Sequence, residues 1–134
     1  MITINNYEKF EQLILFRGVE WGKKYPMDMD FLLELNDEAF VFGEVKTAGT
    51  DILTGQRIAI ERLCRRVKKG GAHAVGLLVT HNIRTPNPIP LKDCLLAKYY
   101  LYKKQDGWRW REPSKTIYTR QAVELICKTW GVRL

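Results

Sequence analysis

Two carboxylates and a lysine stand in one short stretch of the chain, as Asp30, Glu44 and Lys46. Glu44 and Lys46 are two residues apart in the run AFVFGEVK, which has the composition of a β-strand, so their side chains share a face. A hairpin with the preceding run DFLLEL brings Asp30 beside them. Paired carboxylates bind hard cations such as Mg²⁺, and a nearby lysine can position a water molecule. This chemistry suits hydrolysis of phosphodiester bonds. The alternative is that Glu44 and Lys46 form a solvent-facing pair on an ordinary strand.

Gln56 joins this group because it lies four residues before Ile60, at the head of an apolar stripe on an expected helix. A glutamine on the first turn of a buried helix face is uncommon for packing alone. Gly49 and Gly55 flank the turn that carries the helix back toward the lysine. The alternative is that the stripe begins at Ile60 and that Gln56 lies at its solvent edge.

The elements that must position these residues alternate between helix and strand. The sequence predicts helices over 7–18, 54–69 and 119–130, and strands over 30–35, 39–46, 74–80, 94–103 and 108–111. Asn36 to Glu38 and Gln105 to Gly107 are predicted turns, and Thr119 is the predicted cap of the last helix. The central helix is expected to pack by an apolar stripe of Ile60, Leu63, Cys64 and Val67. This order predicts an α/β sandwich around a mixed sheet, and 134 residues suit a single domain, 1–134.

The composition excludes several classes of protein. Hydrophobic residues make up 46% and charged residues 28%, which excludes a disordered chain, a collagen and a coiled coil. No apolar run reaches the ~18–20 residues that a membrane span needs, and the start does not have the layout of a signal peptide. Cys64, Cys94 and Cys127 are far apart, which predicts free thiols in a reducing compartment. We therefore expect a cytoplasmic protein.

The charge is unevenly distributed along the chain. The net charge is +7, with −5 in residues 1–56 and +12 in residues 57–134. A basic surface attracts polyanions, most often nucleic acid. Six basic residues are expected on the outer face of the central helix, where they either bind phosphates or are simply solvated: Arg57, Arg62, Arg65, Arg66, Lys68 and Lys69.

Aromatic and basic residues alternate from Trp108 to Arg111, as Trp-Arg-Trp-Arg. On a strand this places both tryptophans on one face and both arginines, Arg109 and Arg111, on the other. One interpretation is a core tryptophan pair with exposed arginines that contact nucleic acid. The other is an exposed tryptophan that stacks on an unpaired base.

The order of these motifs resembles the PD-(D/E)XK nuclease superfamily. Asp30 is followed by E-V-K at 44–46, a glycine-containing loop and L-T-G-Q at 53–56. The pattern is most similar to the VRR-NUC branch, which includes small stand-alone viral nucleases, and it covers about residues 26–82. The resemblance implies a restriction-endonuclease-like α-β-β-β-α-β core with a mixed sheet flanked by helices. A C-terminal β-hairpin and a helix would follow that core.

The resemblance also implies a role for each matched residue. Asp30 and Glu44 would bind Mg²⁺ or Mn²⁺, with the main-chain carbonyl of Val45 as a further ligand. Lys46 would position the attacking water and stabilise the developing charge, and Gln56 would support the site from the helix.

Two other acidic residues are further candidates for metal ligands. In some relatives a glutamate of the first helix joins the site, and Glu20 is the candidate here. The superfamily's Pro-Asp pair is broken, because Pro26 is followed by Met27. Asp30 leads the apolar run as the superfamily aspartate does, but Asp28 would take its place if the hairpin were one register longer.

The function implied by the resemblance is that of a Mg²⁺- or Mn²⁺-dependent endonuclease with no small-molecule cofactor. The small size favours recognition of branched or flapped DNA, such as a Holliday junction, over a long sequence. Phage DNA replication, recombination or packaging in a bacterial host is the implied setting, and a homodimer the implied assembly. The alternatives are a catalytically silent nucleic-acid-binding protein on the same fold and a protein-interaction or inhibitor module.

Overall fold

The structure is a computed structural model that describes residue 15 and residues 17–134. The helix predicted over 7–18 therefore lies almost wholly outside the described residues. The described elements follow in chain order: β1 (Phe31–Leu35), β2 (Ala39–Thr47), α2 (Thr54–Lys69), β3 (His73–His81), the 3₁₀ turn η1 (Leu91–Asp93), β4 (Leu95–Lys103), β5 (Gly107–Arg111) and α3 (Thr119–Trp130). Each strand boundary lies within one residue of its predicted position.

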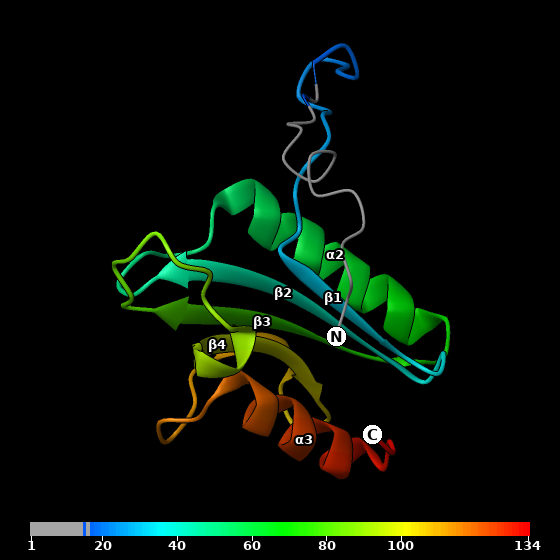
Figure 1. Ribbon diagram of the computed structural model, residues 1–134. Helices are drawn as coiled ribbons and strands as arrows, with labels where there is room; N and C mark the ends of the chain where they lie inside the picture. The colour runs from blue at the N-terminus through cyan, green and yellow to red at the C-terminus, as the bar shows by residue number, and fades with distance from the viewer. Residues whose placement is uncertain (1–14, 16) are drawn as a thin grey trace.

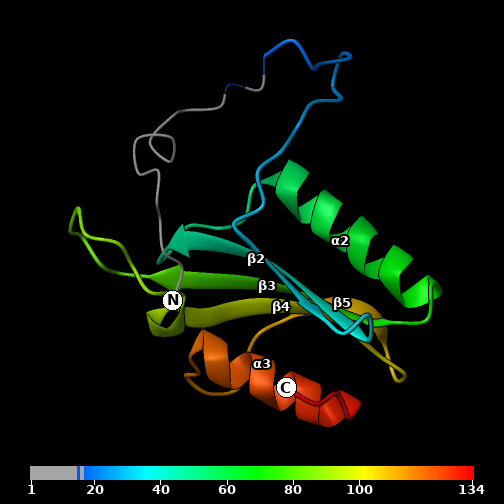
Figure 2. The ribbon, with the colours of Figure 1, turned by 45° about the vertical axis from the view of Figure 1, so that its right-hand side comes forward.

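One five-stranded sheet separates two helices, with α2 on one face and α3 on the other (Figure 1). The strands lie in the order β1-β2-β3-β4-β5. β2 and β3 are parallel, and the other neighbouring pairs are antiparallel. The arrowheads of β2 and β3, which mark the C-terminal ends of the strands, consequently point in the same direction (Figure 2). This arrangement confirms the predicted α/β fold with a mixed sheet.

The chain before β1 differs from the implied α-β-β-β-α-β core. That core has three strands before its central helix, whereas the described residues place two strands, β1 and β2, before α2. Residues 17–29 form turns and one isolated bridge, between Trp21 and Lys24. Pro26 has no N–H to donate to a ladder, and few of these side chains are buried. This segment therefore has neither the hydrogen bonds nor the packed face of a further strand.

The hairpin between β1 and β2 sets the register on which the candidate site depends. Asn36 and Asp37 both have positive φ, 54° and 59°, as the central residues of a type I′ turn require. Phe31 pairs with Gly43, and its ring lies where any side chain at position 43 would be. A one-residue slip would move every β1 side chain to the other face. Packing over Gly43 therefore holds Asp30, just before β1, level with Glu44.

Helix α2 begins and ends where the sequence predicts, at Thr54 and Lys69, followed by Gly70. Ile60 and Cys64 are buried against the sheet, and a methyl group of Ile60 sits directly over Gly76. Leu63 is 39% exposed, so its predicted place in the buried stripe is wrong. Close approach at Gly76 sets α2 over β2 and β3, and the rings of Tyr100, Trp108 and Trp110 pack beside it on the β4–β5 side of this face.

The opposite face of the sheet carries the larger apolar core. Val75, Leu77 and Val79 alternate along β3 and pack with residues of β4 and α3. Thr119 was the predicted cap of α3 but is its first residue, and its hydroxyl donates to the Cys94 carbonyl at 2.9 Å. The backbone N–H of Tyr118 donates instead to the Gln121 amide oxygen at 3.2 Å. The Thr119 hydroxyl therefore binds the buried Cys94 carbonyl and does not cap the helix.

The three cysteines are free, as predicted, and all three are buried. Burial raises the pKa of the Cys64 thiol to about 12, so it stays protonated and unreactive near neutral pH. Within the described part of the chain, no helix has the length and apolar character needed to cross a membrane.

Candidate functional site

Glu44 is the buried acidic residue of the sheet. It lies on β2 opposite Leu78 of β3, on the face that α2 covers, and is only 2% exposed. Its Oε2 atom is buried without a hydrogen-bond partner among the described residues. Burying such an atom unpaired costs about 1–3 kcal/mol. Packing alone does not account for a glutamate here, because a leucine would fill the place without that cost.

Asp30 lies against Glu44 across the β1–β2 hairpin. Its Oδ2 accepts a hydrogen bond from the Val45 N–H at 2.7 Å, and its carboxyl is within hydrogen-bonding reach of the Glu44 carboxyl. Asp30 itself is exposed, so the pair is buried at one end and open to solvent at the other. The structure thus brings together two carboxyl groups that are fourteen residues apart in sequence.

The electrostatics of this pair favour a neutral Glu44. Burial raises the pKa of Glu44 to about 7, and the hydrogen bond with Asp30 and its negative charge act in the same direction. The positive charge of Lys46 opposes this rise. Near neutral pH, ionisation of Glu44 beside the negative charge of Asp30 therefore costs free energy. A positive charge bound near the two carboxyl groups would lower this cost.

Lys46 and Gln56 complete the group on the same side of the sheet. Lys46 follows Glu44 by two residues on β2 and is half-buried. Gln56 is on the first turn of α2, and its Oε1 atom is buried without a partner in the described structure. The segment before β1 passes close by, since a Cβ at Gly55 would stand 3.6 Å from the Met27 sulfur. Glu44 and Gln56 thus each have a buried oxygen without a partner among the described residues, and both residues lie on the α2 side of the sheet.

The other two candidate ligands do not join them. Asp28 and Glu20 are both exposed. Among the described residues no group of three or more acidic, histidine or cysteine side chains is placed to hold a metal ion. Among the described residues, Asp30 and Glu44 are therefore the two carboxylates that could hold a cation together.

The basic residues of α2 fall into two groups. Arg57 is paired with Glu61 at 2.8 Å, and the Arg65 guanidinium donates to the Tyr100 hydroxyl at 3.0 Å. The Arg57 ion pair lies within α2, whereas the Arg65 hydrogen bond joins α2 to β4. The remaining four are exposed, as predicted: Arg62, Arg66, Lys68 and Lys69.

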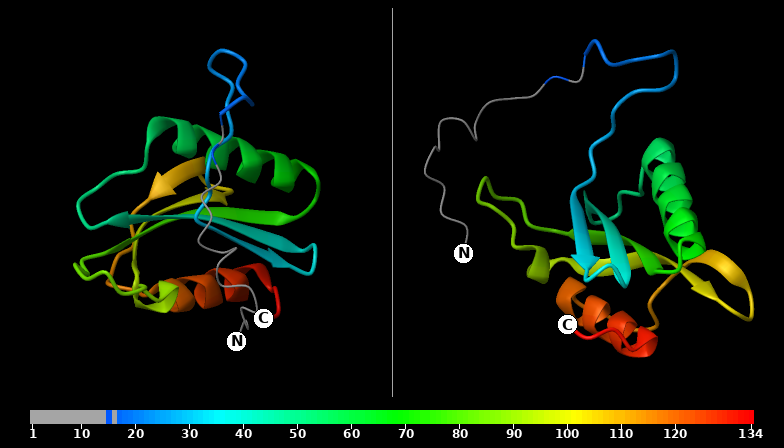
Figure 3. Two further views of the ribbon diagram at one scale, coloured as in Figure 1. Left: turned by 45° about the horizontal axis from the view of Figure 1, so that its top comes forward. Right: turned by 90° about the vertical axis from the view of Figure 1, so that its right-hand side faces the viewer.

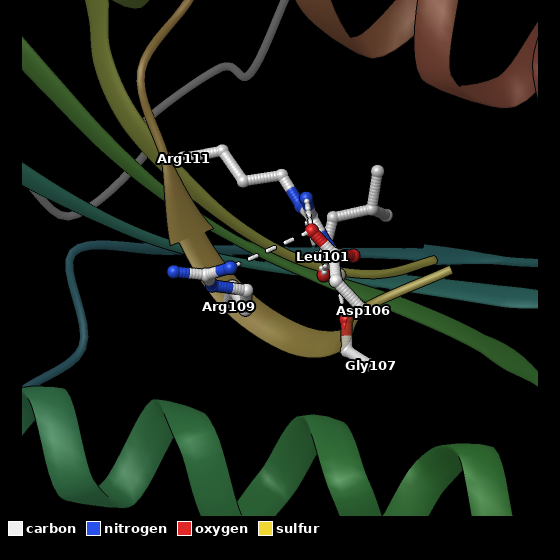
Figure 4. Close-up of polar contacts among 5 residues, drawn as sticks. All are labelled: Leu101, Asp106, Gly107, Arg109 and Arg111. Carbon is white, nitrogen blue, oxygen red and sulfur yellow. Dashed lines mark hydrogen bonds and ion pairs between the residues drawn. The ribbon is translucent and has the colours of Figure 1, made fainter. Parts of the chain in front are cut away.

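One of the two arginines of β5 differs from the prediction. Arg109 is exposed, with 66% of its side chain open to solvent, but Arg111 is only 14% exposed. Figure 4 shows Arg111 turned toward Asp106, Leu101 and Gly107. Its guanidinium binds the Asp106 carboxylate at 2.7 Å and two main-chain carbonyls. The expectation that Arg111 is exposed is wrong, because the tight β4–β5 turn supplies acceptors that the guanidinium satisfies locally.

Two functional candidates left no pattern in the sequence. Lys98 of β4 lies opposite Leu78, which itself lies opposite Glu44, so the three share one row across the sheet. With strands ~4.8 Å apart, Lys98 begins about 10 Å from Glu44. It is held at 3.5 Å from Asp51, on the loop that leads to α2. Only the sheet order brings this lysine near the carboxyl pair.

Glu61 is the second of these candidates. Its Oε2 accepts the indole N–H of Trp110 at 2.8 Å and also binds Arg57. Glu61 is the only acidic residue of α2, and this was a weak sign in the sequence that it binds a specific partner.

Comparisons of the chain with protein family models, with curated proteins and with solved structures find no match.

Proposed function

We propose that this protein is a metal-dependent nuclease that hydrolyses phosphodiester bonds in DNA. The observation that carries the proposal is the paired carboxyl groups of Asp30 and Glu44, with an unpartnered buried oxygen on Glu44. Lys46 on the same strand face and Gln56 on the facing helix add the remaining members of the PD-(D/E)XK pattern. A purely structural role does not explain why one oxygen of Glu44 is buried without a partner among the described residues.

The residues present fit a hard divalent cation. Two carboxylates, one with a buried oxygen that has no partner among the described residues, are the donor set that Mg²⁺ or Mn²⁺ prefers. Val45, whose N–H donates to Asp30, would add its main-chain carbonyl. Asp30, Glu44 and Val45 would hold the cation. When bound, it would neutralise phosphate charge and lower the pKa of a water molecule.

The protein's own residues do the positioning. The Lys46 ammonium would donate to the attacking water, orient it toward phosphorus and offset charge that develops on the phosphate. Gln56 would fix the geometry from the first turn of α2, since its buried oxygen has a place for a donor. The exposed basic residues of α2 would contact the DNA backbone without reading sequence.

The favoured substrate is DNA of a particular shape. The protein is small, and contacts from its exposed basic residues to phosphates carry no sequence information. Branched or flapped DNA, as formed in phage-type replication, recombination or packaging, is therefore the substrate class we assign. A homodimer would place two such sites on one branched molecule.

The test is a cleavage assay on labelled linear, flapped and four-way DNA, with Mn²⁺ or with EDTA. We expect Mn²⁺-dependent cutting that is fastest on a branched or flapped substrate and disappears when Glu44→Gln replaces the wild type. Binding to every substrate with no cutting would favour a silent nucleic-acid-binding protein. Neither binding nor cutting would favour a protein-interaction role.

A further inference from the structure

An aromatic cluster with a basic border lies beside α2, on the β4–β5 part of the α2-facing side of the sheet. Trp108 stacks on Tyr100 with centroids 5.0 Å apart, and Tyr102 meets Trp108 edge-on at 5.8 Å. Tyr100 is buried, Trp108 is partly exposed and Tyr102 is 40% exposed. Figure 3 shows the β4–β5 hairpin, which carries these rings, extending past the side of α2. The cluster therefore continues from the core to the surface.

Positive charge borders the exposed end of this cluster. The Lys68 ammonium lies over the Tyr102 ring, 4.2 Å from its centroid. The Arg65 guanidinium donates to the Tyr100 hydroxyl. From residue 62 to residue 69 the helix carries five basic residues and no acidic one. Exposed rings beside such a helix match a ligand that has both flat apolar faces and negative charges.

We propose that Tyr102 and Trp108, bordered by Lys68 and Arg65, form a stacking site for the bases of an unpaired DNA strand. This inference rests on the proposed nuclease function, because it identifies where the unpaired part of a flapped or branched substrate binds. Aromatic rings stack on any base, but bases inside a duplex are covered by their neighbours, so the site selects unpaired nucleotides. Phosphates of the strand would displace Lys68 from the ring and pair with its ammonium.

The position of the cluster predicts the length of unpaired DNA that can reach it. Gln56 is on the first turn of α2 and Lys68 on the last, twelve residues further along. At 1.5 Å per residue the separation is about 18 Å. An unpaired strand held at the carboxyl pair would therefore have to span a path of about 18 Å along α2 to stack on Tyr102.

Binding measured in EDTA separates this site from catalysis. A fluorescein-labelled oligothymidylate of about 15 nucleotides is compared with an abasic strand of equal length, which keeps the phosphates and lacks the bases. We expect wild-type protein to bind the oligothymidylate about tenfold more tightly. Tyr102→Leu should abolish this preference, and Tyr102→Phe should retain it. Tyr118→Leu is the matched control, because Tyr118 is 49% exposed at the start of α3.

Equal binding of both strands by the wild type would overturn the proposal, as would an unchanged preference in folded Tyr102→Leu. Circular dichroism establishes that the variant is folded. The two proposals fail separately. A protein that prefers bases but never cuts DNA keeps the stacking site and loses the nuclease, and one that cuts without this preference does the reverse.

Discussion

Both faces of the sheet bury polar atoms, but the two faces differ in whether these atoms have hydrogen-bond partners. On the α3 face, the hydroxyl of buried Thr119 donates to the Cys94 carbonyl at 2.9 Å. On the α2 face, Glu44 is equally buried, yet one of its carboxylate oxygens has no partner in the described structure. Gln56 on the same face has another such oxygen. The α3 face is built for stability, whereas the α2 face accepts a cost in stability that a bound cation and substrate would recover.

Leu77→Ala is the substitution expected to destabilise the core on the α3 face most. Leu77 is fully buried in the larger core, so we expect a loss of about 3–5 kcal/mol in the free energy of unfolding. Urea denaturation measures this loss, with Leu125→Ala as control, because Leu125 is 51% exposed on α3. The rate of DNA cleavage per folded molecule should stay unchanged. A folded Leu77→Ala protein that cannot cut DNA would show that the two faces are not separable.

Lys46→Ala tests the proposed activity of the α2 face. We expect cleavage to fall by about 10²–10³-fold, because the substitution removes a donor aimed at the reacting water and phosphate. The free energy of unfolding should change by less than ~1 kcal/mol, since Lys46 is only half-buried. Single-turnover kinetics gives the rate, and Lys128→Ala on α3 is the control. An unchanged rate would remove Lys46 from the mechanism.

The sequence predicted the secondary structure of both faces well. Helix α2 begins and ends at the predicted residues because glycines follow it and its apolar residues recur at helical spacing. The turn after Leu35 was clear from Asn36 and Asp37, which tolerate positive φ. Asp30 and Glu44 meet as expected because side chains alternate along strands in a fixed register.

Partners that long side chains reach across the fold were not predictable in this way. Alternation along β5 predicts an exposed Arg111, yet this residue binds Asp106 and the carbonyls of the β4–β5 turn. Lys98 gave no local signal, since only the order of β2, β3 and β4 aligns it with Glu44. Such partners depend on tertiary geometry, which periodicity does not encode.

The cost carried by the α2 face should appear in the pH dependence of stability without metal. The pKa of Glu44 rises from 4.5 to about 7 on folding. Between these values the folded protein keeps a proton that the unfolded chain releases, so stability falls as the pH rises through this window. Above it the cost approaches an upper limit on the order of 3 kcal/mol.

Glu44→Gln sharpens this point, because an amide keeps the shape and does not ionise. In EDTA we expect the variant to match the wild type near pH 4.5 and to be the more stable protein by up to about 3 kcal/mol at pH 8. Urea denaturation at several pH values measures the difference. If the two proteins lose stability in parallel from pH 4.5 to 8, Glu44 is not the buried acid described here.

The smallest expected effect concerns the exposed basic residues. Arg66→Gln with Lys69→Gln should weaken DNA binding and reduce the salt slope by up to ~0.9 for each phosphate that the variant no longer neutralises. Arg65 is unsuitable because its guanidinium also binds Tyr100. Lys115→Gln with Lys128→Gln removes equal charge on the α3 side as a control. Equal slopes for the two double variants would mean that α2 does not track the DNA backbone.

The most direct test of the carboxyl pair is metal binding without DNA, since it needs no knowledge of the substrate. Calorimetric titration of Mn²⁺ at pH 8 would compare the wild type with Glu44→Gln and with Glu124→Gln, an exposed glutamate of α3. We predict one Mn²⁺ bound by the wild type and by Glu124→Gln, and none at that site in Glu44→Gln. Mn²⁺ binding that is unchanged in Glu44→Gln, or absent from the wild type, would contradict the account.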